Sequence, residues 1–237
     1  ITEPVRGTGH YEPLKHYAEV QLELKPLPRG SGNKFNCNLS VDILDTNWQR
    51  LILTHLKEKI HVGVLTGSPI TDMKIEVAAG RAHLKHTEGG DFRQATYRAV
   101  RHGLMHADSV LLEPFYLYEV VVPENCTGRV MNDMEKMHGT CSIDESGSGF
   151  VTLSGNVPVA TAKNYMNEVR AYTKGLGTLS LSLGGYQKCH NQEEIVKQSG
   201  YNPDADFENP SSSVFCSHGA GFNVPWNEVN DYRHIKD

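Results

Sequence analysis

The sequence predicts an α+β protein made of two two-layer domains, and three patterns support that class. In the first half, stretches in which every second residue is apolar alternate with stretches in which apolar residues recur at helical spacing. In the second half the same signals follow the order βαββαβ, which is the order of a split βαβ unit. The halves do not repeat one another, and 237 residues suffice for two such cores. We therefore expect two domains followed by a polar C-terminal stretch.

The first regular element is a strand at residues 17–25, YAEVQLELK. Val20 and Leu22 alternate there with Glu19 and Gln21, so we expect the apolar set to face a core and the polar set to face water. A loop, PLPRGSG, follows, because its prolines and glycines interrupt regular structure. KFNCNLSVDI, residues 34–43, predicts a second strand.

Two helices and one more strand complete the first domain. Residues 46–62 predict an amphipathic helix that ends before Gly63, and 71–77 predict a strand. After a loop over 80–90, Asp91 is expected to N-cap a helix that ends near His106. The apolar stripe of the first helix is Trp48, Leu51, Ile52, Leu56 and Ile60, and that of the second is Phe92, Ala95, Ala99 and Val100.

The second domain follows a boundary near Pro114 and has a regular pattern. Its helices carry apolar stripes, and its two middle strands are joined by ESGSG, a glycine-rich hairpin turn. This order predicts a ferredoxin-like sheet. The expected elements are a strand at 115–122, a helix at 125–138, strands at 140–145 and 149–155, a helix at 159–174 and a strand holding Leu179, Leu181 and Leu183.

The stretch after Cys189 is polar and rich in turn-forming residues. We expect a short helix at 191–199, apolar anchors such as Phe215 and Trp226 that pack the stretch on the body, and a frayed, charged C-terminus. The domains are thus assigned to residues 1–110 and 111–189, with 190–237 as a C-terminal extension.

Composition excludes several classes of function. The net charge is −5, so any basic contact surface must be local, and no apolar run is long enough to cross a bilayer. The five scattered cysteines favour reduced thiols in a cytoplasm. A phosphate-binding GxxxxGK[ST] loop does not occur, and the glycine pairs in GTGHYE and GSGNKF are expected to form turns.

The segment GRAHLKH, residues 80–86, concentrates cationic and imidazole side chains with no acid before Glu88. Arg and Lys pair with phosphate, and His can stack on bases or bond to their edges. The pattern therefore favours contact with a polyanion, and the alternative is a solvated loop that is rich in His by chance. The candidate residues are Arg81, His83, Lys85 and His86, with Arg6, His10, Tyr11, Lys15 and His16 as a second set.

Metal and nucleophile patterns are weaker. His10, His16, His83 and His86 could serve a metal-dependent enzyme, although none has finger-like or HExxH spacing. The sequence has no GxSxG element, so no catalytic nucleophile is indicated. Since the histidine spacings do not indicate a metal site either, we expect no catalytic residue and no metal-binding residue. A metal-dependent enzyme and a protein-interaction module acting through the tail remain the alternative functions. The tail also offers Cys189, His190, Cys216 and His218 as possible ligands.

The order of several motifs resembles the elongation factor G family of translational GTPases. LELKPLPRGSG, before a strand and an amphipathic helix, resembles the start of domain IV. SVLLEPFYLYEVVVPENCTGRVMNDMEKMHG resembles the junction into domain V. FVTLSGNVPVATAKNYMNEVRAYTKGLGTLSLSLGGYQKC resembles the same region of the tetracycline ribosomal protection proteins, whose ADFR is similar to GDFR here. The likeness covers about residues 1–190.

The resemblance implies a domain IV with a ribosomal-protein-S5-like fold and a ferredoxin-like domain V. It implies that this fragment is not an enzyme and holds no cofactor, while GTP and Mg belong to the full-length parent. The implied partner is the ribosome, bound through ribosomal RNA at the A site and decoding centre. The implied state is a cytoplasmic monomer without a membrane partner.

In this family two loops at the tip of domain IV approach the decoding centre, and they correspond here to Arg6–Lys15 and Gly80–Gly90. His83 matches a histidine of elongation factor G. The protection proteins carry a Ser-Pro-Val-like segment where this chain has Leu84-Lys85-His86, so translocation, tetracycline removal and ribosome rescue stay open for the parent. The implied RNA-binding residues are Arg81, His83, Lys85, His86, His10, Tyr11 and Lys15.

Overall fold

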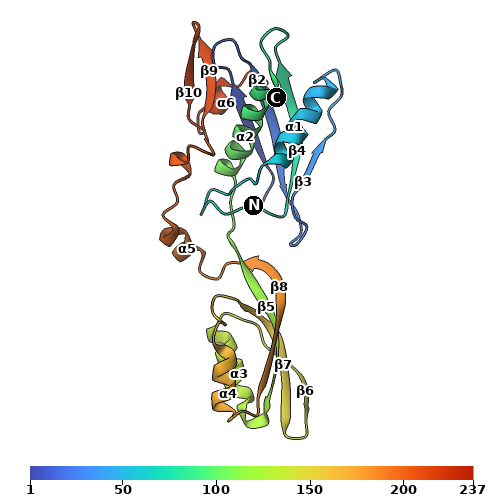
Figure 1. Cartoon of the computed structure of the whole chain (residues 1–237), viewed down its shortest axis with the longest axis vertical. Helices are drawn as coiled ribbons and strands as arrows, with labels where there is room; N and C mark the ends of the chain where they lie inside the picture. The colour runs from blue at the N-terminus through green and yellow to red at the C-terminus, as the bar shows by residue number, and fades with distance from the viewer. Residues whose placement is uncertain (237) are drawn as a thin grey trace. The chain divides into compact units, whose positions relative to one another are not determined.

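The computed structural model describes residues 1–236, which form two compact units (Figure 1). Unit 1 combines residues 1–110 with the chain from Gln192 onward, and unit 2 comprises Leu111–Asn191. Each unit has its own sheet and its own hydrophobic core, which confirms the predicted α+β class. Among the described helices, none combines the length and the apolar character needed to cross a membrane.

Unit 1 is built on a six-stranded sheet in the order β10-β9-β1-β2-β4-β3. Strand β9 runs parallel to β1, whereas β1, β2 and β4 are antiparallel neighbours. The elements are β1 (Val5–Tyr11), β2 (Ala18–Pro26), β3 (Lys34–Cys37), α1 (Thr46–Glu58), β4 (Met73–Ala82), α2 (Gly89–His106), α5 (Gln192–Ser199), a 3-10 turn (Pro203–Ala205), β9 (Ser213–Ser217), β10 (Ala220–Val224) and α6 (Val229–Tyr232).

The main core of unit 1 lies between one face of this sheet and the helices α1 and α2 (Figure 1). The apolar stripe predicted for α2 is buried throughout. In α1, Ile52 and Leu56 are buried, but Ile60 is 73% exposed because the helix ends at Glu58 rather than at residue 62. The strand predicted over 34–43 is also shorter, since β3 ends at Cys37 and turns follow it.

Strand β1 corrects the expectation that residues 7–12 are turns. Its glycines allow the strand to lie directly against α2, since a Cβ on Gly7 would overlap the Ala99 carbonyl oxygen and one on Gly9 would overlap that of Ala95. Gly7 and Gly9 occupy the centre of the inner face, and only Val5 and Tyr11 at its two ends are apolar, so no alternation of apolar residues marks the strand in the sequence. The packing surface here is the backbone of the helix itself.

The other face of the sheet is covered as well. Glu19 and Gln21 were expected to face water, yet they are 0% and 1% exposed. The Glu19 carboxylate accepts hydrogen bonds from the backbone amides of His234 and Ile235, and the Gln21 side chain donates to the Ile235 carbonyl. The C-terminal segment is therefore docked on the sheet through residues 234 and 235, contrary to the expectation of a frayed end.

A small third cluster supports this docking. Phe215 from β9, Val224 from β10 and Val229 from α6 are buried together. Among the described residues, the chain after unit 2 thus adds two strands, the helices α5 and α6 and a separate apolar cluster to unit 1 (Figure 1).

Unit 2 has a four-stranded antiparallel sheet in the order β6-β7-β5-β8, with α3 and α4 on one face (Figure 1). Its connectivity is the predicted ferredoxin-like βαββαβ. The helix predicted over 159–174 is shorter, as α4 covers only Tyr165–Tyr172. The elements are β5 (Leu112–Pro123), a 3-10 turn (Glu124–Cys126), α3 (Thr127–Lys136), β6 (Ser142–Gly147), β7 (Phe150–Pro158), α4 (Tyr165–Tyr172) and β8 (Thr178–Lys188).

Candidate functional site

Two loops meet at one end of the unit 1 sheet, and we call residues 12–17 and 83–88 together the tip. They lie side by side because β1, β2 and β4 are neighbours, with Tyr11 opposite Ala18 and Ala18 opposite Ala82. The Tyr17 amide donates to the His86 carbonyl, and the Thr87 hydroxyl donates to the Tyr17 carbonyl. The structure therefore brings the end of the predicted Arg6–Lys15 segment beside the predicted Gly80–Gly90 loop, although residues 6–11 of the first belong to strand β1.

The 83–88 loop is held in a compact turn. The amides of His86 and Thr87 donate to the His83 carbonyl, while the His83 amide donates to the Thr87 hydroxyl at 2.7 Å. The rings of His83 and His86 stack with their centroids 4.6 Å apart and their planes 17° apart. Leu84 at the apex is fully exposed, with a relative accessibility of 105%.

Helix α2 begins directly after this loop. Glu88 is its N-cap residue, and the Asp91 carboxylate accepts the Glu88 amide at 2.8 Å, so Asp91 caps from the third helical position rather than from the N-cap expected for it. Asp91 also contacts His16, at 3.0 Å from Nδ1. One carboxylate thus fastens both loops to the start of the helix.

The candidate residues of the second loop are all on the surface. Arg81, at the end of β4, and His83, Lys85 and His86 are exposed. Lys15 is exposed too, next to Leu14, whose backbone is left-handed at φ 54°. These side chains present cations and imidazoles around one apolar residue, an arrangement suited to phosphates and unstacked bases.

Two candidates of the first segment do not face solvent freely. His10 lies within β1 and is 0% exposed. The Tyr11 ring is half-buried beneath the Arg98 guanidinium, at 5.2 Å from its centroid. Both residues belong to the base of the tip, because the segment that carries them is a central strand.

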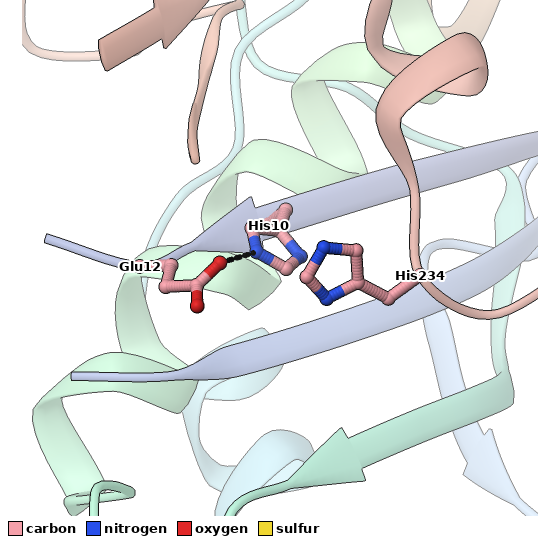
Figure 2. Close-up of side chains that lie close together, drawn as sticks. All are labelled: His10, Glu12 and His234. Carbon is pink, nitrogen blue, oxygen red and sulfur yellow. Dashed lines mark hydrogen bonds and ion pairs between the residues drawn. The ribbon is translucent and has the colours of Figure 1, made fainter. Parts of the chain in front are cut away.

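His10 is the centre of a network that sequence reasoning missed. Its Nδ1 lies 2.7 Å from Glu19 Oε2 and its Nε2 lies 3.0 Å from Glu12 Oε2. The ring stacks on Phe215 at 4.1 Å between centroids. His234 comes from the C-terminal segment and lies edge-on to the His10 ring, with the centroids 4.6 Å apart (Figure 2).

Burial and hydrogen bonding set the charges in this network. Burial alone would raise the pKa of Glu19, but the hydrogen bonds from His10 and from the two C-terminal amides outweigh it, so that pKa lies below its usual value. Burial and the neighbouring His10 lower the pKa of His234. Burial also raises the pKa of Tyr17, whose hydroxyl lies 3.1 Å from His234 Nδ1. Glu19 is therefore held as a carboxylate and His234 tends towards a neutral ring.

The cysteine and histidine pairs of the tail lie in different units. In unit 2, Glu113 Oε1 accepts from the His190 amide and lies 2.6 Å from His190 Nδ1, with Cys189 close by. Burial raises the pKa of the Cys189 thiol. Cys216 lies in β9 and His218 in the turn after it, and among residues 1–236 neither joins a group of three possible metal ligands.

Comparisons with known proteins agree with this architecture. The model of the family "Elongation factor G, domain IV" matches residues 8–108, and that of "Elongation factor G C-terminus" matches 110–195. The chain is 27% identical over 186 residues to elongation factor G of Dehalococcoides mccartyi, covering 78% of this chain and 27% of that protein. It is 29% identical over 185 residues to an elongation factor G-like protein of Thermotoga maritima, covering 77% and 27%.

Among solved structures, a protein from Thermus thermophilus matches with a TM-score of 0.71 and 25% identity, covering 84% of this chain and 31% of that one. The chain spans about a quarter of the length of the curated relatives. The fold and the order of the two matched domains are those of the C-terminal domains of a translational GTPase. The chain belongs to the elongation factor G family, of which it carries domain IV and the C-terminal domain.

Proposed function

We propose that this chain is the ribosome-contacting part of an elongation factor G-like translational GTPase, and that its tip contacts ribosomal RNA in the A site. The observation that carries the proposal is the exposed group Arg81, His83, Lys85 and His86 on a rigid base. The net charge of −5 supplies no general attraction to RNA, so a local basic surface is needed for such contact.

Each side chain of the tip has a role that its chemistry allows. Arg81, Lys85 and Lys15 pair with phosphate oxygens. The stacked rings of His83 and His86 offer a flat surface on which an unstacked base can lie. His10 is excluded from direct contact because it is buried, and it instead positions the strand beneath the tip.

The parent protein would couple this contact to GTP hydrolysis. We propose that GTP and Mg²⁺ are held outside the residues of this chain, whose sequence has no GxxxxGK[ST] loop. Isothermal titration of this chain with Mg·GTP is then expected to give no binding heat. A saturable micromolar isotherm would contradict this part of the proposal.

The test is ribosome pelleting with the full-length protein. Replacing Arg81, His83, Lys85 and His86 together by Ala should weaken binding and flatten its dependence on salt, because fewer phosphate contacts release fewer counterions. The loss of base stacking should weaken the free energy of binding by about 1 to 3 kcal/mol more. The fold should be unaffected, since all four side chains are exposed.

A matched control removes the same formal charge elsewhere. Arg50 and Lys57 are exposed on α1, and Arg50→Ala with Lys57→Ala should leave pelleting unchanged. If the tip variant and this control bind ribosomes as tightly as the wild type at every salt concentration, the assignment of the tip is wrong.

A further inference from the structure

His10, Glu12 and His234 place three possible ligand atoms within 4.8 Å of one another (Figure 2). His10 and Glu12 come from β1 and the residue just past its end, whereas His234 follows α6 at the other end of the sequence. His10 is buried, Glu12 is half-buried and His234 is exposed. An ion can therefore reach it from solvent.

The surroundings of His10 match those of a metal-binding histidine. Its Nδ1 is bonded to the buried Glu19 carboxylate, and a ligating histidine usually gives its second ring nitrogen to such a carboxylate. This contact directs Nε2 towards Glu12, at 3.0 Å. Stacking on Phe215 fixes the plane of the ring. The orientation of the first ligand is thus set before any ion binds.

The second histidine is also held by hydrogen bonds, through its ring and through its backbone. His234 Nδ1 lies 3.1 Å from the Tyr17 hydroxyl, and the His234 amide is bonded to Glu19 at 2.8 Å. One carboxylate therefore supports both histidines, through the ring of the first and the backbone of the second. Two imidazoles and one carboxylate form a donor set suited to zinc, with a water in the fourth position of a tetrahedron.

We propose that His10 Nε2, the Glu12 carboxylate and His234 bind one divalent cation of the zinc class, which fastens the C-terminal segment to the sheet beneath the tip. The ion would take the place of the proton that the contact between His10 Nε2 and Glu12 requires. It would link residues that are 224 positions apart in the chain. Hard cations such as Mg²⁺ prefer oxygen ligands and are not expected to bind here.

The experiment titrates Zn²⁺ into the tag-free chain after chelator treatment and measures binding by calorimetry and the melting temperature of unit 1. We expect one zinc per chain and a higher melting temperature. His234→Ala and Glu12→Gln should each raise the Kd for Zn²⁺ at least about 10-fold. Even the loss of a residue that only hydrogen-bonds to a metal ligand typically weakens metal binding by about that factor. Neither variant removes a buried ring, so both should fold. Failure of Zn²⁺ to bind the wild type would overturn the proposal.

Two control variants separate this site from other ligands. His190→Ala removes the group of Glu113, Cys189 and His190 in unit 2, and His83→Ala removes an exposed histidine of the tip. Both should retain zinc binding with the wild-type Kd. Loss of binding in either control, with binding kept in His234→Ala, would place the ion elsewhere and overturn the proposal.

Cobalt substitution gives a second readout that does not depend on stability. Co²⁺ at two imidazoles and a carboxylate should give visible bands of a four-coordinate ion without a sulfur-to-cobalt charge-transfer band. A sulfur-to-cobalt charge-transfer band would reveal a cysteine ligand and contradict the assignment. Absence of four-coordinate bands would contradict the donor set.

Discussion

Glu19 shows how a single polar residue can become structural. It is fully buried, and a buried carboxylate without partners is strongly unfavourable. Here its oxygens accept from His10 and from the amides of His234 and Ile235, so its desolvation is offset by bonds to a charged acceptor. The stability of the sheet and the docking of the C-terminal segment therefore depend on the same side chain.

His102 makes the stability of unit 1 sensitive to acid. It is 0% exposed and accepts a hydrogen bond from the Thr8 amide on Nδ1, which requires that nitrogen to be unprotonated. Burial, followed by the neighbouring His106, lowers the pKa of His102 to about 4. An unfolded histidine takes up its proton near pH 6.5, so the unfolded state binds more protons between the two values.

The contribution of His102 to the free energy of unfolding should therefore be complete above about pH 6.5. The free energy of unfolding should fall by on the order of 3 kcal/mol as the pH approaches 4. Urea titrations followed by tryptophan fluorescence measure this, since both tryptophans, Trp48 and Trp226, belong to unit 1. His102→Gln should be less stable at neutral pH and should lose less stability on acidification. Parallel curves for the two proteins would show that His102 is not the group responsible.

At the scale of elements, β1 packs directly against the backbone of α2. Gly7 and Gly9 lie against the helix backbone, so the strand approaches α2 more closely than side chains would permit. Gly103 on the helix meets Gly7 from the other side of the contact. The base of the tip is fixed by this contact, because β1 leads directly into the 12–17 loop.

Gly9→Ala should destabilise unit 1 by about 1 to 3 kcal/mol or more, because the new methyl group meets the Ala95 carbonyl and the Ala99 amide. Gly90→Ala is the matched control, since a Cβ there meets nothing within 4 Å and the residue lies in the first turn of α2. Ala is favoured over Gly in a helix, so the control should be neutral or slightly more stable. Equal destabilisation by both changes would argue against the backbone contact.

The C-terminal segment can be tested by truncation. A chain that ends at Arg233 lacks the amides of His234 and Ile235 and should lose at least about 1.5 kcal/mol of stability, as expected for lost bonds to a charged acceptor. A chain that ends at Ile235 keeps both amides and should match the full chain. Urea unfolding in the presence of a chelator measures both without any contribution from metal. Identical midpoints for the two truncations would contradict the docking.

The sequence predicted the elements whose signal is local. The stripe of α2 and the βαββαβ order of unit 2 both follow from apolar spacing within a few turns or strands. Strand β1 was not predicted because the centre of its inner face is glycine, and the burial of Glu19 was not predicted because residues more than 200 positions away cover it. The loop with His83 could be predicted because its residues are neighbours in the sequence. The contact between His10 and His234 joins distant segments and had no local signal.

At the scale of the whole molecule, unit 2 is a continuous stretch and unit 1 is not. Unit 2 has its own buried cluster, which includes Val120, Leu153 and Val169. A fragment of residues 110–191 should therefore fold alone, with a cooperative thermal transition by circular dichroism and dispersed amide signals by NMR. Limited proteolysis of the full chain should release the same fragment by cleavage near both of its ends. A fragment without a cooperative transition would show that its core needs unit 1.

The discontinuity of unit 1 imposes an order on events during synthesis. Within this chain, translation delivers residues 1–110 before unit 2, and the strands β9 and β10 and the two backbone amides that bond to Glu19 follow unit 2. Domains fold as units while the chain emerges, so unit 2 can reach its native state while the nascent sheet of unit 1 still lacks two strands and the Glu19 carboxylate still lacks two of its hydrogen-bond donors. The proposed ribosome-contacting tip therefore gains its full support only after unit 2 has been synthesised.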